Sequence, residues 1–429
     1  MKKIKVLAAA LAALMLMGGT AMAHGPGSPH GGNAVTRWNG IAIETLPVDP
    51  GLVLDSRAFA ILHGAIHDAV NGVSPRYQSY AIQLSAPRGA SVDAAVAAAA
   101  HDVLVALSPS QQVKVEIAYA AALLAVPEGA AKQAGIKLGQ QSAAANLARR
   151  IGDGADTSTG PAYVPDGTPG DYDFTPPFDV PPLGPGALFP AWGKVTPFAI
   201  ELSQHQLPGP DALTSAAYAR DFNELKSIGR LDSAIRTPEQ TDIALFWFEF
   251  SPMGWNRIAN TILVQEEADV WRSARILALV NFALADGYIA GFEAKYRFRF
   301  WRPYTAIRKA DSDGNAATRA DPNWMPLSAP AFFTPPVPDY PSTHTVLGAA
   351  TAEVLIRSFG DRVSFNVVST TLPGTTRHFN SITAAAWENG MSRIYGGIHF
   401  RRAVRDGFRQ GQSIGREVSR MLPRIEDAP

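Results

Sequence analysis

The stretch RAFAILHGAIHDAVNGV, residues 57–73, carries apolar side chains at intervals of three and four positions. This spacing places them on one face of an α-helix, which completes a turn about every 3.6 residues. The same period predicts further helices at residues 92–107, 110–124, 129–151, 211–228, 237–248, 255–270, 273–295, 342–359, 381–395 and 401–422. Alternating strand patterns are scarce, so we predict an all-α protein built from packed helical bundles.

Two segments interrupt the helical pattern. Residues 161–197 contain ten prolines, and residues 311–341 are rich in Pro, Asp and Asn. Both are longer than ordinary connections between helices, which makes them candidate lids or pocket walls. We divide the chain into an N-terminal helical half, residues 24–235, which includes the first of these loops, and a C-terminal helical bundle, residues 236–429.

Residues 1–23 have the layout of a secretory signal peptide. A lysine-rich start precedes the apolar run 6–17, and Ala21-Met22-Ala23 is a small-x-small cleavage site. The alternative, an N-terminal membrane anchor, needs a longer apolar stretch. The best later candidate for a span, residues 274–292, contains an asparagine and an aspartate. We therefore expect a periplasmic or secreted protein, cleaved after Ala23, whose mature chain does not insert into a membrane.

Charge and cysteine content exclude several function classes. The chain contains 38 basic and 38 acidic residues and no long basic run, so no feature indicates a nucleic-acid partner. It contains no cysteine, which excludes disulfide bonds and thiolate chemistry. The sequence leaves open whether the chain forms a homo-oligomer.

Three short strings near the C-terminus contain the groups that an oxyanion site needs. They are KYRFRFWRP at residues 295–303, PSTH at 341–344 and SRIYGGIH at 392–399. Together they supply three cations, a hydroxyl and two imidazoles: Lys295, Arg302, Arg393, Ser342, His344 and His399. Such a set is able to hold a tetrahedral or trigonal-bipyramidal oxyanion and to place an imidazole nitrogen against its central atom.

The local context of each string is consistent with this interpretation. Lys295 and Arg302 are two helical turns apart, and the guanidinium of Arg302 offers a rigid fork to two oxyanion oxygens. Pro341-Ser342 begins an apolar helical run, with Ser342 as the expected cap and free N–H groups at the helix start. His344 in the first turn is then placed as an acid or base.

In this order and spacing, the strings resemble the signature of the vanadium-dependent haloperoxidases and the type 2 phosphatidic acid phosphatase superfamily. That signature is K-x6-R-P, then P-S-x-H, then S-R-x5-H, and every fixed position is met. The aromatic run before Arg302 and the string WENGMSR at 387–393 resemble the fungal chloroperoxidase branch. The resemblance covers residues 273–421 and implies two packed helical bundles, with the site in the second.

The resemblance also implies a role for each site residue. His399 would be the axial ligand of vanadate, or the phosphohistidine nucleophile of a phosphatase. Lys295, Arg302 and Arg393 would balance the charge of the equatorial oxygens, while Ser342 and the Thr343 N–H donate hydrogen bonds to them. His344 would be the acid–base partner. The implied partners are hydrogen peroxide and a halide, which the enzyme would convert to hypohalous acid.

Four positions depart from the family pattern. Thr343 replaces a common glycine, and Ala403 replaces a common aspartate four residues after His399. Asp406, about one helical turn further on, is a candidate substitute for that aspartate. Phe292 and Val337 replace a Trp and a Phe associated with the halide pocket, so the halide is not predicted.

Three rival interpretations stay open at this stage. A periplasmic acid phosphatase would use the same residues on a phosphomonoester, through a phosphohistidine at His399. A non-enzymatic exported helical protein would carry a degenerate site. His63 and His67, four apart and followed by Asp68, are one half of a conceivable zinc site, but no matching His-Glu string is present, so buried structural histidines are the favoured interpretation.

Overall fold

The computed structural model describes residues 32–46, 53–329 and 332–427, and the predicted signal peptide lies outside them. The described residues are mainly helical, which confirms the predicted fold class. The α-helices are α2 (Ala34–Thr45), α3 (Val53–Val73), α4 (Val92–Leu107), α5 (Gln112–Leu124), α6 (Ala130–Arg149), α7 (Ala216–Ile228), α8 (Pro238–Phe246), α9 (Ser251–Gln265), α10 (Val270–Phe298), α11 (Pro303–Arg308), α12 (Thr343–Phe359), α13 (Ile382–Tyr395) and α14 (Arg401–Val418). Among these residues, one hairpin of β1 (Phe365–Val368) and β2 (Thr376–Phe379) is the only named sheet.

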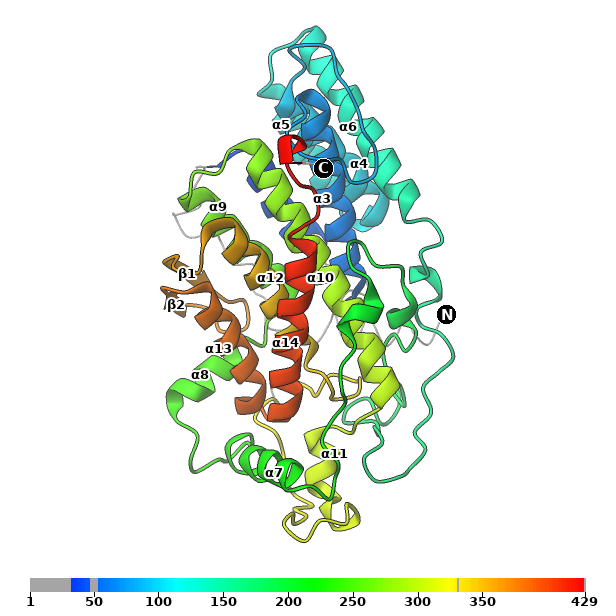
Figure 1. The fold of residues 1–429 in the computed structure, drawn as a ribbon, viewed down its shortest axis with the longest axis vertical. Helices are drawn as coiled ribbons and strands as arrows, with labels where there is room; N and C mark the ends of the chain where they lie inside the picture. Colours follow the sequence, from blue (N-terminus) through cyan, green and yellow to red (C-terminus); the bar gives the residue numbers. More distant parts are fainter. Residues whose placement is uncertain (1–31, 47–52, 330–331, 428–429) are drawn as a thin grey trace.

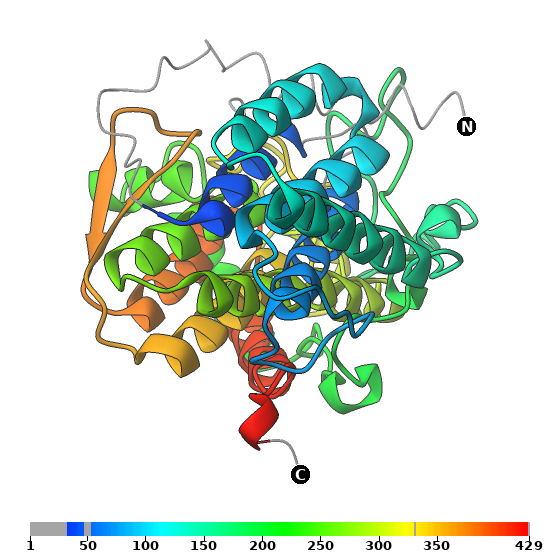
Figure 2. The same cartoon turned by 90° about the horizontal axis from the view of Figure 1, so that it is seen from above.

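The long helix α10 runs through the middle of the molecule (Figure 1). Helices α3 to α6 gather at one end, α12 and α14 pack against α10, and α13 packs against α12 and α14. Seen from the first end, α4 and α6 lie over the rest of the molecule, and the β-hairpin lies at its edge (Figure 2). The helix α10 therefore joins the N-terminal helices to the C-terminal bundle.

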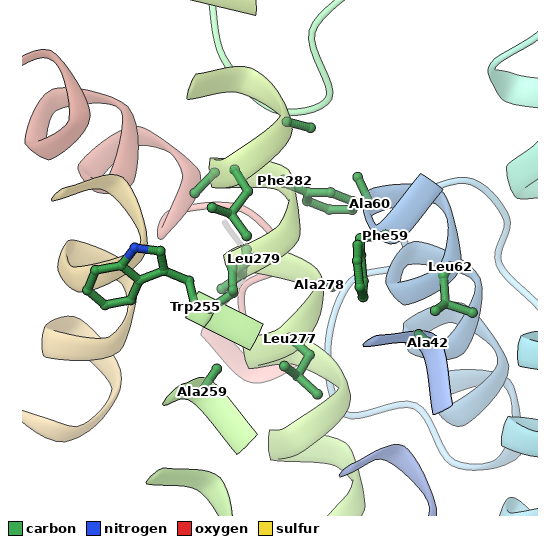
Figure 3. Packing of buried hydrophobic residues seen from close by; sticks show 14 of the residues in the cluster. Ala42, Phe59, Ala60, Leu62, Trp255, Ala259, Leu277, Ala278, Leu279 and Phe282 are labelled. Atoms are coloured by element: carbon green, nitrogen blue, oxygen red, sulfur yellow. The ribbon is translucent and has the colours of Figure 1, made fainter. Parts of the chain in front are cut away.

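One continuous apolar core extends along both faces of α10. Phe282 on α10 faces Phe59 on α3, while Leu279 lies on the side of Trp255 from α9 (Figure 3). These side chains are almost completely removed from water. Burial of each side chain of this size contributes about 1.5–3 kcal/mol, so α10 is held from two sides. This rigid support matters because the last turn of α10 carries Lys295.

Close contact between α12 and α14 depends on three glycines spaced four apart on α14. A Cβ atom added at Gly411 would lie 2.2 Å from the Val346 carbonyl oxygen, and one at Gly415 would lie 2.5 Å from that of Ala350. Gly407 approaches the Ser342 carbonyl in the same way, at 2.8 Å. The two backbones therefore approach more closely than any larger residue allows, which fixes the start of α12 beside the loop that precedes α14.

The structure differs from the sequence prediction at one helix end that matters for the site. We predicted a helix over residues 273–295, and Lys295 and Arg302 would face one site if that helix continued as far as Arg302. The helix ends at Phe298 instead, because Arg299 adopts a left-handed conformation (φ 54°). Arg302 is then extended and precedes the separate helix α11.

One described helix, α10, is long and apolar enough to cross a membrane. However, 94% of its most apolar window is buried inside the protein, as in the core helix of a folded domain. Its asparagine and aspartate are both satisfied internally. Asn281 exchanges hydrogen bonds with Asn256, and Asp286 accepts from the N–H groups of Phe198 and Ala199.

Candidate active site

A cavity of about 130 Å³ lies where the end of α10, the start of α12 and the loop before α14 meet. Five of the seven predicted site residues line it: Arg302, Thr343, His344, Arg393 and His399. Lys295 and Ser342 do not reach its wall. Residues distributed over about a hundred positions of sequence therefore converge on one polar floor.

Lys295 supports the floor of the cavity from behind. Its ammonium group is completely buried and donates to three backbone carbonyls, those of Pro338, Asp339 and Pro341, at 2.6, 3.0 and 2.7 Å. Burial, and then the neighbouring Arg302, lower the pKa of Lys295 well below its usual value. The lysine thus holds together the carbonyls of the turn that leads into α12. Its charge acts on the cavity from behind this turn, without direct contact.

Arg302 contacts the His399 ring directly. Its Nη1 donates to the Ile398 carbonyl at 2.9 Å and lies 3.1 Å from His399 Nε2, while its Nε donates to the Val337 carbonyl at 2.7 Å. The other ring nitrogen, His399 Nδ1, lies 2.8 Å from Asp339 Oδ1. Burial, and then the cations Arg302 and Lys295, lower the pKa of His399 well below its usual value. The imidazole is therefore neutral at physiological pH.

The start of α12 presents Thr343 to the cavity. Ser342 occupies the N-cap position, but its side chain makes no capping bond to the helix backbone, contrary to our prediction. Its hydroxyl instead accepts a hydrogen bond from Thr345 Oγ1 at 2.9 Å. The departure at Thr343 is accommodated by Gly291 on α10, where a Cβ atom would lie 2.3 Å from Thr343 Cγ2. The side chain of Thr343 therefore fits because Gly291 opposite it has none.

His344 lies in the first turn of α12, and its two ring nitrogens have different environments. Nδ1 is 2.8 Å from the hydroxyl of Ser251, the first residue of α9. Nε2 is buried and has no hydrogen-bond partner among the described residues. Burial, and then Arg393, lower the pKa of His344 well below its usual value. A neutral imidazole with an unpartnered nitrogen in a cavity is placed to exchange a proton with a bound group.

Arg393 lies in the last turn of α13 and provides hydrogen-bond donors at the cavity. Its Nη1 donates to the Trp247 carbonyl at 3.1 Å, whereas its Nε and Nη2 have no partner among the described residues. Burial, and then Arg302, lower the pKa of Arg393 to about 9. A buried guanidinium with two unsatisfied donors is costly unless an anion accepts from them.

These observations fit a tetrahedral or trigonal-bipyramidal oxyanion such as vanadate. The floor carries two buried guanidinium groups and an imidazole with an unpartnered nitrogen, all facing one cavity. Helix α12 begins at Thr343, where the first N–H groups of a helix have no intrahelical partner and attract anions. Donors exceed acceptors on this floor, so an oxygen-rich anion completes it.

The rest of the cavity wall is mainly apolar and also includes the carboxylate Glu249. Aromatic, aliphatic and proline residues form the apolar part: Leu188, Phe248, Phe250, Tyr288, Phe292, Phe333, Pro335, Pro336, Val337 and Ile398. Both Pro-rich segments contribute residues, so they form parts of the pocket wall. The departures at Phe292 and Val337 both lie on this wall. An apolar wall keeps bulk water from the floor and strengthens its electrostatic interactions.

One sequence prediction about a group beside His399 is corrected by the structure. Asp406 does not serve His399, since its carboxylate accepts from Tyr340 Oη at 2.7 Å and pairs with Arg402. Asp339 occupies the place beside His399 instead. Sequence reasoning also missed Ser251, which no motif marks. The only sequence signal for Asp339 was its position three residues before Ser342 in the PSTH string.

The histidine pair of the N-terminal half has a structural role. His63 Nε2 lies 2.9 Å from Asn39 Oδ1, and His67 Nε2 lies 2.9 Å from the Gln78 carbonyl. Both rings are completely buried. Within residues 32–46, 53–329 and 332–427, no three metal-binding side chains of the His, Cys, Asp and Glu types gather at one point.

Comparison with known proteins agrees with the site. Residues 275–427 match the VCPO second helical-bundle domain. The vanadium chloroperoxidase of Curvularia inaequalis is 28% identical over 487 aligned positions, which cover 86% of this chain and 78% of that protein. A solved bacterial vanadium-dependent iodoperoxidase superposes with a TM-score of 0.77 at 25% identity, covering 92% of this chain and 97% of the other.

Residues 275–427 therefore carry the second helical-bundle domain of the vanadium haloperoxidases, and the chain as a whole is similar to members of that family. A bacterial vanadium-dependent chloroperoxidase in its holo form shares the fold, with a TM-score of 0.69 at 18% identity and coverage of 95% of this chain and 96% of the other. The names of these relatives describe peroxidases that depend on vanadium.

Proposed function

We propose that this protein is a vanadium haloperoxidase that binds vanadate on the floor of the cavity, with His399 Nε2 as its protein ligand, and oxidises halide with hydrogen peroxide. The observation that carries the proposal is the surplus of buried donors around the cavity. Two nitrogens of Arg393 and one nitrogen of His344 have no partner there among the described residues. When bound, vanadate acts as a Lewis acid that activates hydrogen peroxide toward attack by the halide.

Each residue on the floor has a definable task. Arg302 and Arg393 balance the negative charge of the anion's oxygens, and the start of α12 adds the N–H of Thr343. Lys295 acts through the backbone turn that it holds. His344 Nε2 holds or releases a proton for the bound oxygen, while Ser251 fixes the ring at Nδ1. The apolar wall excludes water, so that hypohalous acid forms from halide at a shielded site.

We propose iodide and bromide as the oxidised halides, in preference to chloride. Two observations support this choice. The iodoperoxidase has a higher TM-score (0.77) than the chloroperoxidases (0.69), and this chain has Phe292 and Val337 at positions on the apolar wall. Iodide is also the most easily oxidised halide of the three, so it sets the least demanding test. Residues 1–23 support export of the enzyme to the periplasm or medium.

The test measures halogenation and phosphate hydrolysis side by side. Purified protein is first stripped of bound anion, then assayed with peroxide and iodide, bromide or chloride, with and without added vanadate. Phenyl phosphate hydrolysis is measured on the same preparation. The proposal expects iodide and bromide oxidation that depends on vanadate. Hydrolysis of phenyl phosphate without any vanadate-dependent halogenation would instead establish the acid phosphatase, with His399 as its nucleophile.

A further inference from the structure

We propose that Asp339 is the positioning residue of His399, holding the imidazole in the tautomer with its proton on Nδ1 and its lone pair on Nε2. This inference rests on the proposed role of His399 as the ligand of the anion. A ligand nitrogen must offer a lone pair, so the tautomer decides whether Nε2 can bind at all.

The position of the carboxylate is the first observation. Asp339 Oδ1 lies 2.8 Å from His399 Nδ1 and 3.9 Å from Arg302 Nη1. The 2.8 Å separation is that of a hydrogen bond, although the N–H direction is bent away from the ideal line and no regular hydrogen bond forms. Neither carboxylate oxygen has a regular hydrogen-bond partner elsewhere in the described part of the chain. An ionised carboxylate is an acceptor only, so beside ionised Asp339 the proton of this pair stands on Nδ1.

The second observation concerns the opposite side of the same ring. Arg302 Nη1 lies 3.1 Å from His399 Nε2. The same Nη1 lies 3.5 Å from Nδ1, so the guanidinium faces the ring on the side nearer Nε2, and its positive charge disfavours a proton on that nitrogen. Two charged neighbours of opposite sign therefore favour the same tautomer. The guanidinium already directs a positive group at the nitrogen that would bind the anion.

The third observation concerns the aspartate that the resembled family commonly has four residues after the ligand histidine. Position 403, four residues after His399, is alanine. Asp339 and Ala403 line the same small cavity of about 10 Å³, which is separate from the main cavity. Asp339 is anchored there by its own N–H, which donates to the Phe300 carbonyl at 2.8 Å, and by Lys295, which holds its carbonyl. The chain thus supplies the carboxylate from the turn before α12 rather than from α14.

The test reads the tautomer of His399 in the anion-free protein by long-range proton–nitrogen NMR spectra of ¹⁵N-histidine-labelled samples. Loss of its signals in His399→Ala identifies them. The wild type should show a protonated Nδ1 and an unprotonated Nε2. In Asp339→Asn, whose amide is able to donate to Nδ1, the proton should move partly or wholly to Nε2. Vanadate affinity should then fall about 10- to 100-fold, as is typical when a partner of a ligand histidine is removed.

Two further variants serve as controls. Asp286→Asn makes the same substitution at another buried aspartate, whose partners are the N–H groups of Phe198 and Ala199, and should leave the His399 signals unchanged. Asp339→Ala combined with Ala403→Asp should recover part of the vanadate affinity lost in Asp339→Ala alone. An unchanged tautomer and unchanged vanadate affinity in Asp339→Asn would overturn the inference. Because the spectra need no vanadate, failure of the proposed function would be seen separately, as a wild type that binds none.

Discussion

The Oγ atom of Ser251 lies 2.8 Å from Nδ1 of His344, although the two residues are 93 positions apart in the chain. The first is the first residue of α9, and the second lies in the first turn of α12. This contact fixes the orientation of the imidazole while its other nitrogen stays without a partner in the cavity. His344, the proposed acid–base residue, is therefore oriented by a helix that contains none of the sequence motifs.

Replacing Ser251 with alanine should slow turnover more than it weakens anion binding. The change leaves a buried ring nitrogen without its partner, at a cost of about 1–3 kcal/mol. If that cost falls on the reacting state, turnover drops about 5- to 150-fold. Steady-state kinetics of iodide oxidation, with vanadate affinity measured in parallel, checks this expectation. Ser251→Thr, which keeps a hydroxyl, is the matched variant, and full activity in Ser251→Ala would refute the assigned role.

Lys295→Met should reduce the free energy of unfolding as well as activity. The ammonium is the common donor to the carbonyls of Pro338, Asp339 and Pro341, and its removal leaves three buried acceptors unsatisfied. Each such group costs about 1–3 kcal/mol, so a loss of at least about 3 kcal/mol is expected. Urea denaturation of the anion-free protein measures it. A variant as stable as the wild type would show that the lysine does not hold this turn.

Arg393→Met, in contrast to Lys295→Met, should abolish anion binding while hardly changing the stability of the anion-free protein. This guanidinium is buried with two unpartnered nitrogens, so an apolar side chain of similar length should leave the anion-free protein within about 1 kcal/mol of the wild type, or stabilise it. Phosphate and vanadate should raise the melting temperature of the wild type, because they bind the folded state alone. That anion-induced rise should be absent in Arg393→Met. An undiminished rise would remove Arg393 from the anion site.

The burial of His63 predicts that the free energy of unfolding depends on pH independently of the active site. Burial lowers the pKa of His63 to about 3 in the folded protein, against an ordinary value of 6.5. Between these values the unfolded chain binds more protons than the folded one, so the free energy of unfolding falls as pH falls from 6.5 to 3. Each pKa unit is worth about 1.4 kcal/mol, so the loss is on the order of 4 kcal/mol. Urea denaturation across this range should show a flatter pH profile in His63→Gln, and an identical profile would contradict the assignment.

Much of the fold was predictable from local patterns. The apolar period of α3, α12 and α14 is set by burial on one face, and the structure contains these helices close to their expected bounds. The end of α10 was not predictable in the same way. A single left-handed residue, Arg299, ends the helix, and the expected two-turn spacing between Lys295 and Arg302 is lost.

The candidate site, too, could be predicted only in part from the sequence. Motif strings identified five residues that line the cavity, because each string sits at a helix end or turn whose backbone aims it inward. Asp339 and Ser251 were missed because their roles depend on where distant segments meet. Asp339 is 60 positions from His399, and only the path of the turn held by Lys295 brings the two side chains together. No local pattern encodes such a contact.

The central claim is that vanadate binds this cavity through His399, and counting bound vanadium tests it most directly. Wild type and His399→Ala are dialysed against the same vanadate solution, and vanadium per chain is determined by elemental analysis. Circular dichroism and urea denaturation first establish that the variant is folded. We predict about one vanadium per chain in the wild type and none above background in His399→Ala. Equal vanadium content in the two proteins would contradict the assignment of His399 as the ligand.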